Sequence, residues 1–186
     1  NTKRLMAYSS IAHAGFLLLA ILASNGSSLT LTYYLIVLIV SNLLVFYCLN
    51  WFARIHGTLE VRDFAGRGKN SFIPAMGLTA GLLSLTGVPP FGGFSAKILL
   101  FLQLWKISES MNSIIILVAL GFGLLNTVIA LFYYIKIPKA LFLQTGQSIR
   151  IVSPGFSEQV FIILMTVILI LLFALPSWID FAPFID

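Results

Sequence analysis

Charged residues are scarce in this sequence. Only 9% of its 186 residues are charged, whereas 59% are hydrophobic and the mean hydropathy is +1.02. Soluble domains contain about 25% charged residues, so this chain cannot cover a water-facing surface of ordinary size. The composition therefore excludes large soluble domains and predicts a membrane-embedded protein. The length leaves room for about five or six spanning helices of roughly 20 residues each.

Cysteine and metal-binding patterns are scarce as well. The one cysteine, Cys48, excludes an intrachain disulfide, a cysteine-based zinc site and the ligand set of an iron–sulfur cluster. Because Cys48 lies inside an apolar run, we interpret it as a small buried hydrophobic residue. No nucleotide-binding loop, metal-ligand cluster or nucleophile triad is recognisable.

Five apolar runs are long enough to predict membrane spans. They cover residues 5–23, 29–52, 71–105, 111–134 and 156–175. As one helix the third run would be roughly 52 Å long, which exceeds a hydrocarbon core of about 30 Å. No useful length of alternating strand pattern is present. We therefore predict an all-α membrane protein with about five transmembrane helices, of which the third is discontinuous.

The third run contains residues that break a helix. Pro89 and Pro90 remove backbone donors, and the glycines permit backbone angles that other residues avoid. These glycines are Gly87, Gly92 and Gly93. Non-helical backbone at membrane depth is tolerated only where protein or a water-filled cavity satisfies it. The break therefore predicts a packed interior or a polar pathway, with a surface loop between two short helices as the open alternative.

The basic residues are distributed one-sidedly. Five spans place on one side of the membrane the N-terminus and the loops at residues 53–70 and 136–153. The other side receives the C-terminus and the turns at residues 24–28 and 105–110. Nine of the eleven basic residues fall on the first side, Lys106 falls on the second, and Lys97 lies inside a span. Because Lys and Arg favour the cytoplasmic or matrix side, we predict the N-terminus and both basic loops there. The loop at residues 53–70, which has the densest charge, is expected to lie in water.

Lys97 is the main functional candidate. It lies seven residues after Pro90 and eight before Trp105, so it is deep in the third span. A lysine near the bilayer centre costs about 2.5–3.5 kcal/mol to insert, so we expect it to face the protein interior and to bind and release protons. We expect water, backbone carbonyls or another chain as its partners, and the amino end of the half-helix after the break opposes its charge. The alternatives are a lysine that reaches the interface or pairs structurally with another subunit.

The first span carries several polar residues. They are Lys3, Arg4, Tyr8, Ser9, Ser10 and His13, and all of them except Arg4 are candidates for a proton pathway. Ser9 and His13 are four residues apart and so share a helix face. An imidazole beside hydroxyls can pass protons through its two nitrogens. A histidine that makes one interhelical hydrogen bond remains the alternative, and Lys3 with Arg4 also fits an anchor among lipid headgroups.

Two other spans carry polar residues whose role the sequence leaves open. They are Tyr34, Ser41 and Asn42 in the second span and Asn126, Thr127, Tyr133 and Tyr134 in the fourth. Such residues line a pathway or join helices by hydrogen bonds, and the second use is the commoner.

Two segments resemble the antiporter-like membrane subunits of respiratory complex I. They are KRLMAYSSIAHAGF at residues 3–16 and LSLTGVPPFGGFSAK at residues 83–97. The chain is most similar to the subunit 2 type, which the Ser-Ser-Ile-Ala-His string favours. Lys97 stands where the subunit 4 type carries glutamate, and the chain stops soon after Pro176 without the lateral helix of the subunit 5 type. By this resemblance, residues 1–186 form one transmembrane domain that aligns with the tenth to fourteenth helices of the family.

The resemblance implies a part in proton translocation. The broken span corresponds to the family's discontinuous twelfth helix, and Lys97 to the lysine on its central hydrophilic axis. His13 and its serine neighbours correspond to positions near that axis. In the family, quinone reduction elsewhere in the complex drives proton movement through these subunits. The chain is thus expected to act within H⁺-translocating NADH:ubiquinone oxidoreductase and to hold no redox cofactor itself.

Nine helices of the family precede the segment that this chain resembles. We expect either a second polypeptide that supplies them, as in a split subunit, or an incomplete pathway. Other complex I membrane subunits and lipids are the expected partners, and nucleic acid is not. Richness in Phe and Ile fits an AT-rich mitochondrial genome and favours the mitochondrial inner membrane, with the N-terminus in the matrix. The alternatives are a subunit of a multi-subunit cation/proton antiporter and a structural remnant without a working channel.

Overall fold

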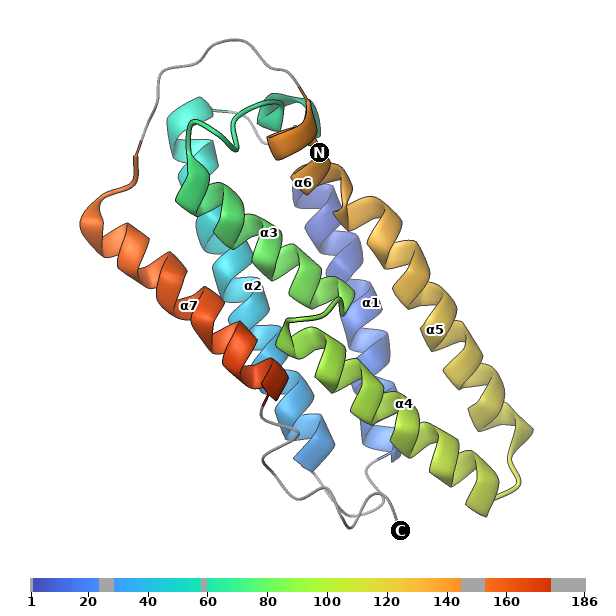
Figure 1. The fold of residues 1–186 in the computed structure, drawn as a ribbon. Helices are drawn as coiled ribbons and strands as arrows, with labels where there is room; N and C mark the ends of the chain where they lie inside the picture. The colour runs from blue at the N-terminus through green and yellow to red at the C-terminus, as the bar shows by residue number, and fades with distance from the viewer. Residues whose placement is uncertain (1, 24–28, 58–59, 145–152, 175–186) are drawn as a thin grey trace.

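Helices make up the architecture of the described residues, which are 2–23, 29–57, 60–144 and 153–174 of this computed structural model (Figure 1). The elements in chain order are α1 (Thr2–Ala23), α2 (Leu29–His56), the short 3₁₀ helix η1 (Val61–Phe64), α3 (Phe72–Thr86), α4 (Gly92–Ser110), α5 (Ile114–Tyr134), α6 (Lys136–Leu143) and α7 (Phe156–Ala174). No strand occurs within the described ranges, which agrees with the predicted all-α class.

Four helical segments are long and apolar enough to cross a membrane. They are Thr2–Ala23, Leu29–Ile55, Ile114–Leu143 and Phe156–Ala174. The 15 residues of α3 and the 19 residues of α4 follow one another across the bundle (Figure 1). Together these two helices form one further span, which is broken and is the third in chain order. The prediction of a discontinuous third span is therefore confirmed.

The ends of the helices gather as the charge distribution predicts. The start of α1, the connection from α2 to α3, and α6 lie at one end of the bundle, and the turn from α4 to α5 lies at the other (Figure 1). The backbone amides of Gly66 and Gly68 donate to the carbonyl oxygens of Ala140 and Leu141, at 3.0 and 2.9 Å. The two basic segments are therefore packed together at one end. Of the basic residues, Arg150 falls outside the described ranges.

Two predicted connections are helical instead. α4 continues to Ser110, so the predicted turn at residues 105–110 is wrong and the chain turns at 111–113. The first eight residues of the predicted loop 136–153 form α6. The side chains that α6 buries are Ile137, Ala140 and Leu141. These apolar residues recur at helical spacing, so burial of one face stabilises the helix despite two flanking lysines. The predicted turn at 24–28 lies outside the described residues.

The predicted water-exposed loop at residues 53–70 is partly buried. α2 extends to His56, and η1 follows within the loop. The side chain of Phe64 is only 1% exposed, and its ring packs edge-on against Phe52, with the ring centroids 5.2 Å apart. The expectation that this whole segment lies in water is therefore wrong, because an aromatic side chain anchors it to the bundle.

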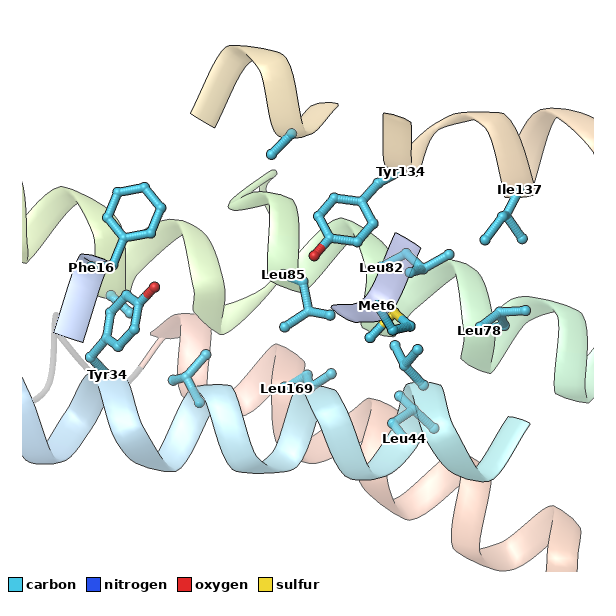
Figure 2. Packing of buried hydrophobic residues seen from close by; sticks show 14 of the residues in the cluster. Met6, Phe16, Tyr34, Leu44, Leu78, Leu82, Leu85, Tyr134, Ile137 and Leu169 are labelled. Atoms are coloured by element: carbon cyan, nitrogen blue, oxygen red, sulfur yellow. The ribbon is translucent and has the colours of Figure 1, made fainter. Parts of the chain in front are cut away.

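α3 lies at the centre of the hydrophobic core. Figure 2 shows its side chains Leu78, Leu82 and Leu85 among buried residues contributed by α1, α2, α5, α6 and α7. Glycine lets α3 approach α2 closely, since a Cβ atom at Gly81 would lie 2.6 Å from Cγ2 of Val45. Cys48 is fully buried in this core, as the sequence predicts for a small hydrophobic residue.

Candidate functional site

The break between α3 and α4 begins with a left-handed glycine. Gly87 has a φ of +86°, a backbone angle that costs a residue with a side chain about 1–2 kcal/mol. The amide of Gly87 donates to the Ser84 carbonyl at 2.9 Å, and the amide of Val88 donates to the Leu83 carbonyl at 3.0 Å. These two bonds form a Schellman motif, which ends α3 and satisfies two of its last carbonyls.

The first turn of α4 packs directly against the last turn of α3. A Cβ atom at Gly93 would lie 1.7 Å from the Ser84 carbonyl oxygen of α3, and one at Gly92 would lie 2.8 Å from Cβ of Leu172 on α7. Gly93 and Gly92 therefore let α4 approach α3 and α7 closely. Among the three predicted break glycines, only Gly87 has a positive φ. The turn between the helices contains Pro89 and Pro90, which are exposed, while both glycines of α4 are buried.

Lys97 is buried beside this break, with 4% of its surface exposed. Its Nζ donates to the carbonyl oxygens of Leu85 and Thr86, at 3.0 and 2.8 Å. These are the two carbonyls at the end of α3 that the Schellman motif leaves without partners. The ring of Phe16 lies below the nitrogen, 4.9 Å from it to the ring centroid, in a cation–π arrangement. The expected interior position and the expected backbone carbonyl partners both agree with this geometry.

The electrostatic surroundings of Lys97 combine two helix ends. The sequence predicts that the amino end of α4 opposes its charge. Nζ also reaches back to the carbonyl end of α3, whose partial negative charge favours a cation. Within the described residues no carboxylate hydrogen bonds to Lys97, so backbone dipoles and an aromatic face are its partners.

α1 directs Ser9 and His13 into the bundle. Nδ1 of His13 lies 2.9 Å from the hydroxyl oxygen of Tyr34, and the Ser9 hydroxyl hydrogen bonds to the hydroxyl of Tyr134. All four side chains are buried. Tyr34 and Tyr134, whose roles the sequence leaves open, therefore join α2 and α5 to α1 through the predicted relay residues.

The other predicted relay residues of α1 point away from the bundle. Tyr8 is 69% exposed, and the Ser10 hydroxyl donates to the Met6 carbonyl of its own helix at 3.1 Å. Lys3 is also exposed, at the end of α1 where the basic segments gather. The structure thus brings His13 and Ser9 to the interior with Lys97, and leaves Lys3, Tyr8 and Ser10 on the outer face of α1.

Two of the other polar residues in the spans bond within their own helices. The Asn42 side chain donates to the Leu38 carbonyl at 3.0 Å, and the Thr127 hydroxyl donates to the Gly123 carbonyl at 3.1 Å. Neither contact crosses to another helix. These two residues therefore do not join helices here.

A small cavity connects the surroundings of Lys97 to those of His13. Five residues of polar type border it, Lys97, His13, Tyr34, Ser41 and Ser84, but the surface that it exposes is almost entirely apolar. Its apolar lining includes Val37, Leu38, Leu85 and Ala96. The volume open to the centre of a water molecule is about 10 Å³.

A hydroxyl pair forms part of the cavity wall. Oγ of Ser41 on α2 lies 2.8 Å from Oγ of Ser84 on α3, and the Gly93 amide of α4 donates to Oγ of Ser84 at 3.3 Å. Ser84 thus ties three helices together at the break. The sequence gives no signal for this contact, because 43 residues separate Ser41 from Ser84 and no helical period relates them.

Comparison with known proteins places the chain in a family. Residues 1–150 match the family described as NADH:quinone oxidoreductase/Mrp antiporter, transmembrane. NAD(P)H-quinone oxidoreductase subunit 2 from the chloroplast of Mesostigma viride is 40% identical over 161 residues, which are 86% of this chain and 30% of that protein. NADH-quinone oxidoreductase subunit N of Phocaeicola vulgatus is 39% identical over 149 residues, which are 79% of this chain and 30% of that protein.

A further relative and a solved structure cover more of the chain. NADH-quinone oxidoreductase subunit N 2 of Herpetosiphon aurantiacus is 35% identical over 96% of this chain and 32% of its own length. A chain of respiratory complex I from Thermus thermophilus, solved with bound aureothin, superposes with a TM-score of 0.70 at 26% identity. The match covers 94% of this chain and 38% of that one. The chain thus spans about a third of the length of these relatives, and it belongs to the NADH:quinone oxidoreductase/Mrp antiporter family of membrane proteins.

Proposed function

We propose that this chain is part of a membrane-arm subunit of proton-pumping NADH:quinone oxidoreductase, and that it carries part of the proton pathway. The observation that carries the proposal is a buried lysine in the broken span whose nitrogen contacts two backbone carbonyls and no described carboxylate. The names of the relatives, which are quinone oxidoreductase subunits, support the same function. In this proposal Lys97 is the group that holds the proton.

The two carbonyl contacts allow Lys97 to exchange a proton without leaving its place. A neutral amine has two N–H groups, which suffice for the Leu85 and Thr86 carbonyls, and an ammonium has a third. The nitrogen therefore binds and releases the proton at its third position, while its hydrogen bonds to the two carbonyls remain. The Phe16 ring stabilises the charged form through its negative face.

His13 is the proposed relay group next to Lys97. Because Nδ1 of His13 bonds to the Tyr34 hydroxyl, Nε2 remains for exchange of a proton. Ser9 extends the buried polar surface of α1 toward Tyr134. Lys3, Tyr8 and Ser10 contribute to the pathway only where another polypeptide segment covers the outer face of α1.

Two substitutions of Lys97 test the proposal in the assembled complex. Lys97→Arg keeps a positive charge and N–H donors for both carbonyls, but an arginine does not release its proton. Lys97→Met removes both properties. We expect both variants to translocate fewer protons per electron than the wild type, measured in proteoliposomes alongside the rate of quinone reduction. Normal proton translocation by assembled Lys97→Arg would contradict the proposal.

A purely structural role is the second candidate, and the position of Nζ on the carbonyl end of α3 favours it. In that case Lys97 would only satisfy the last carbonyls of α3. Each buried carbonyl left without a donor costs about 1–3 kcal/mol, so Lys97→Met would reduce assembly. Lys97→Arg would then restore both assembly and pumping. The arginine variant therefore separates the two functions.

The family description also includes Mrp antiporters, so a subunit of a multi-subunit cation/proton antiporter is the alternative within transport. The two differ in their partners. We expect the chain to co-purify with quinone-reducing subunits and with other complex I membrane subunits. Isolation with antiporter subunits alone would favour the alternative.

Further helices are needed to complete the proposed pathway. Because the chain spans about a third of its relatives, we propose that it corresponds to the last five helices of the fold and that the helices that precede these in the family complete the pathway. Lipid would cover the remaining apolar outer surface, and we propose no redox cofactor in this chain. A map of the assembled complex tests this arrangement at the outer face of α1.

The proposed location is the mitochondrial inner membrane, with the N-terminus and the basic segments in the matrix. The nine-to-one distribution of basic residues supports the orientation, and the richness in Phe and Ile supports the mitochondrial membrane. In a Cys48→Ala background, Lys69→Cys should react with an impermeant maleimide only from the matrix side, and Met111→Cys only from the opposite side. Recovery of the chain in plastid or bacterial plasma membranes would contradict the proposed location.

A further inference from the structure

We propose that Ser95 is a positioning residue for Lys97: its hydroxyl joins the first turn of α4 to the carbonyl end of α7 and thereby fixes the half-helix that carries the lysine. The inference rests on the proposed function of Lys97 and deepens it, because it names a group that holds the lysine nitrogen in place. The family match ends at residue 150 and does not include α7.

The break leaves the two halves of the span without a continuous backbone ladder. An unbroken helix fixes its successive turns through its own backbone hydrogen bonds, whereas α3 ends at Thr86 and α4 begins at Gly92. The contact of Lys97 Nζ with the Leu85 and Thr86 carbonyls crosses from α4 to α3, so it depends on how the two half-helices are placed. An element that holds both half-helices therefore controls the position of this nitrogen.

α7 is such an element, because it lies against both half-helices. It runs alongside α3 and ends beside the start of α4 (Figure 1). A Cβ atom at Gly77 of α3 would lie 2.4 Å from Cγ2 of Ile162 on α7. Further along the same helix, Cβ of Leu172 would lie 2.8 Å from a Cβ atom at Gly92 of α4. Since α7 is one uninterrupted helix of 19 residues, it bridges the break as a rigid element.

Ser95 makes a polar contact between α4 and the end of α7. Its buried hydroxyl donates to the Phe173 carbonyl at 3.0 Å. Phe173 lies in the last turn of α7, where backbone carbonyls lack a partner within the helix. The bilayer core offers no water to such carbonyls, so another helix must supply the donor. Ser95 supplies it from a position two residues before Lys97, and the contact fixes the turn of α4 from which the lysine side chain extends.

A second hydroxyl holds the same end of α7. Tyr33 on α2 donates to the Leu172 carbonyl, so two of the last four carbonyls of α7 have side-chain donors. Tyr33 holds α7 from α2, whereas Ser95 holds it from the helix that carries Lys97. We therefore expect Tyr33 to support the same arrangement with a smaller effect on the lysine.

Substitutions of Ser95 test the inference in the assembled complex. Thr and Val have nearly the same shape, but only Thr keeps a hydroxyl donor. We expect Ser95→Thr to translocate as many protons per electron as the wild type, and Ser95→Val and Ser95→Ala to translocate fewer while the amount of assembled complex is unchanged. Tyr33→Phe should cause a smaller loss. If Thr and Val are equally impaired, their added methyl groups disturb the packing, and Ser95→Ala, which adds no atoms, decides.

Ser108 provides the matched control on the same helix. Its hydroxyl is also buried, but it donates to the Trp105 carbonyl of α4 itself, at 2.7 Å. Because this contact joins α4 to no other helix, Ser108→Ala should translocate protons like the wild type.

The outcomes separate this inference from the proposed function. Normal proton translocation by assembled Ser95→Ala, together with impaired Lys97→Arg, would overturn the positioning role and leave the proposed function standing. Loss of assembly in Ser95→Ala but not in Ser108→Ala would also overturn it, because the hydroxyl would then serve the fold alone. Normal translocation by assembled Lys97→Arg would contradict the proposed function itself, whatever the Ser95 variants do.

Discussion

Nζ of Lys97 lies 2.8 Å from the carbonyl oxygen of Thr86, the residue at which α3 ends. One side chain of α4 therefore closes the end of α3 and, in our proposal, also holds the transported proton. The break in the span is what makes this contact available, since an unbroken helix would use the Thr86 carbonyl for its own next turn. The discontinuity thus supplies the acceptors for a lysine inside a membrane.

Close packing at the break should be sensitive to a single methyl group. Gly93→Ala places a Cβ atom 1.7 Å from the Ser84 carbonyl oxygen, so α3 and α4 must separate. We expect a destabilisation of about 3 kcal/mol or more, seen as loss of assembled complex and a lower thermal midpoint. Gly121→Ala is the control, because a Cβ atom there meets nothing within 4 Å. Equal assembly of the two variants would contradict the observed approach of the helices.

The pairing of His13 with Tyr34 predicts coupled effects. His13→Ala should reduce proton translocation partially, and Tyr34→Phe should reduce it less, because only the hydroxyl that orients the imidazole is removed. The double variant should match His13→Ala alone, since the hydroxyl acts through the imidazole. The coupling between the two residues is measured as proton translocation per electron in the three assembled variants. Additive losses would show that the Tyr34 hydroxyl acts independently of His13.

The broken span and its interior lysine could be predicted from the sequence because both follow from local rules. The apolar run at residues 71–105 is too long for one straight span, and its prolines and glycines show where the helix breaks. A lysine near the bilayer centre is expected to face the protein interior. Backbone carbonyls were among the predicted partners of Lys97, but their identity, Leu85 and Thr86, was missed although a rule exists for it. Side chains on a helix lean toward its N-terminus, so a long side chain in the second turn of α4 points back at α3.

Contacts between distant helices could not be predicted in the same way. The pairs His13–Tyr34 and Ser41–Ser84 depend on how far one helix slides and rotates against another. Many side chains set that register together, and no residue spacing within one helix reports it. The sequence could therefore identify polar residues in each span, but it could not show which of them meet.

An ion pair at the end of α2 should contribute little and should depend on salt. Arg54 pairs with Glu158 at the start of α7, and the Arg54 side chain is 61% exposed. Arg54→Ala should lower the thermal midpoint of the complex slightly, and less at high salt, because exposed pairs are screened. Glu158→Ala should lower it more at every salt concentration, because Glu158 also accepts from Trp51 Nε1 and the Gly155 amide, at 3.1 and 3.0 Å. Equal decreases of the thermal midpoint in the two variants, independent of salt, would contradict this prediction.

Cys48 provides a natural probe of the core. It is fully buried on α2 against α3, where a Cβ atom at Gly77 would lie 3.2 Å from its Sγ. Thiol reagents require access to the sulfur, so Cys48 should remain unmodified by a membrane-permeant maleimide in the native complex and react after denaturation in detergent. In a Cys48→Ala background, Met111→Cys should react without denaturation, since Met111 is 65% exposed. Rapid modification of native Cys48 would mean that α2 and α3 do not pack as described.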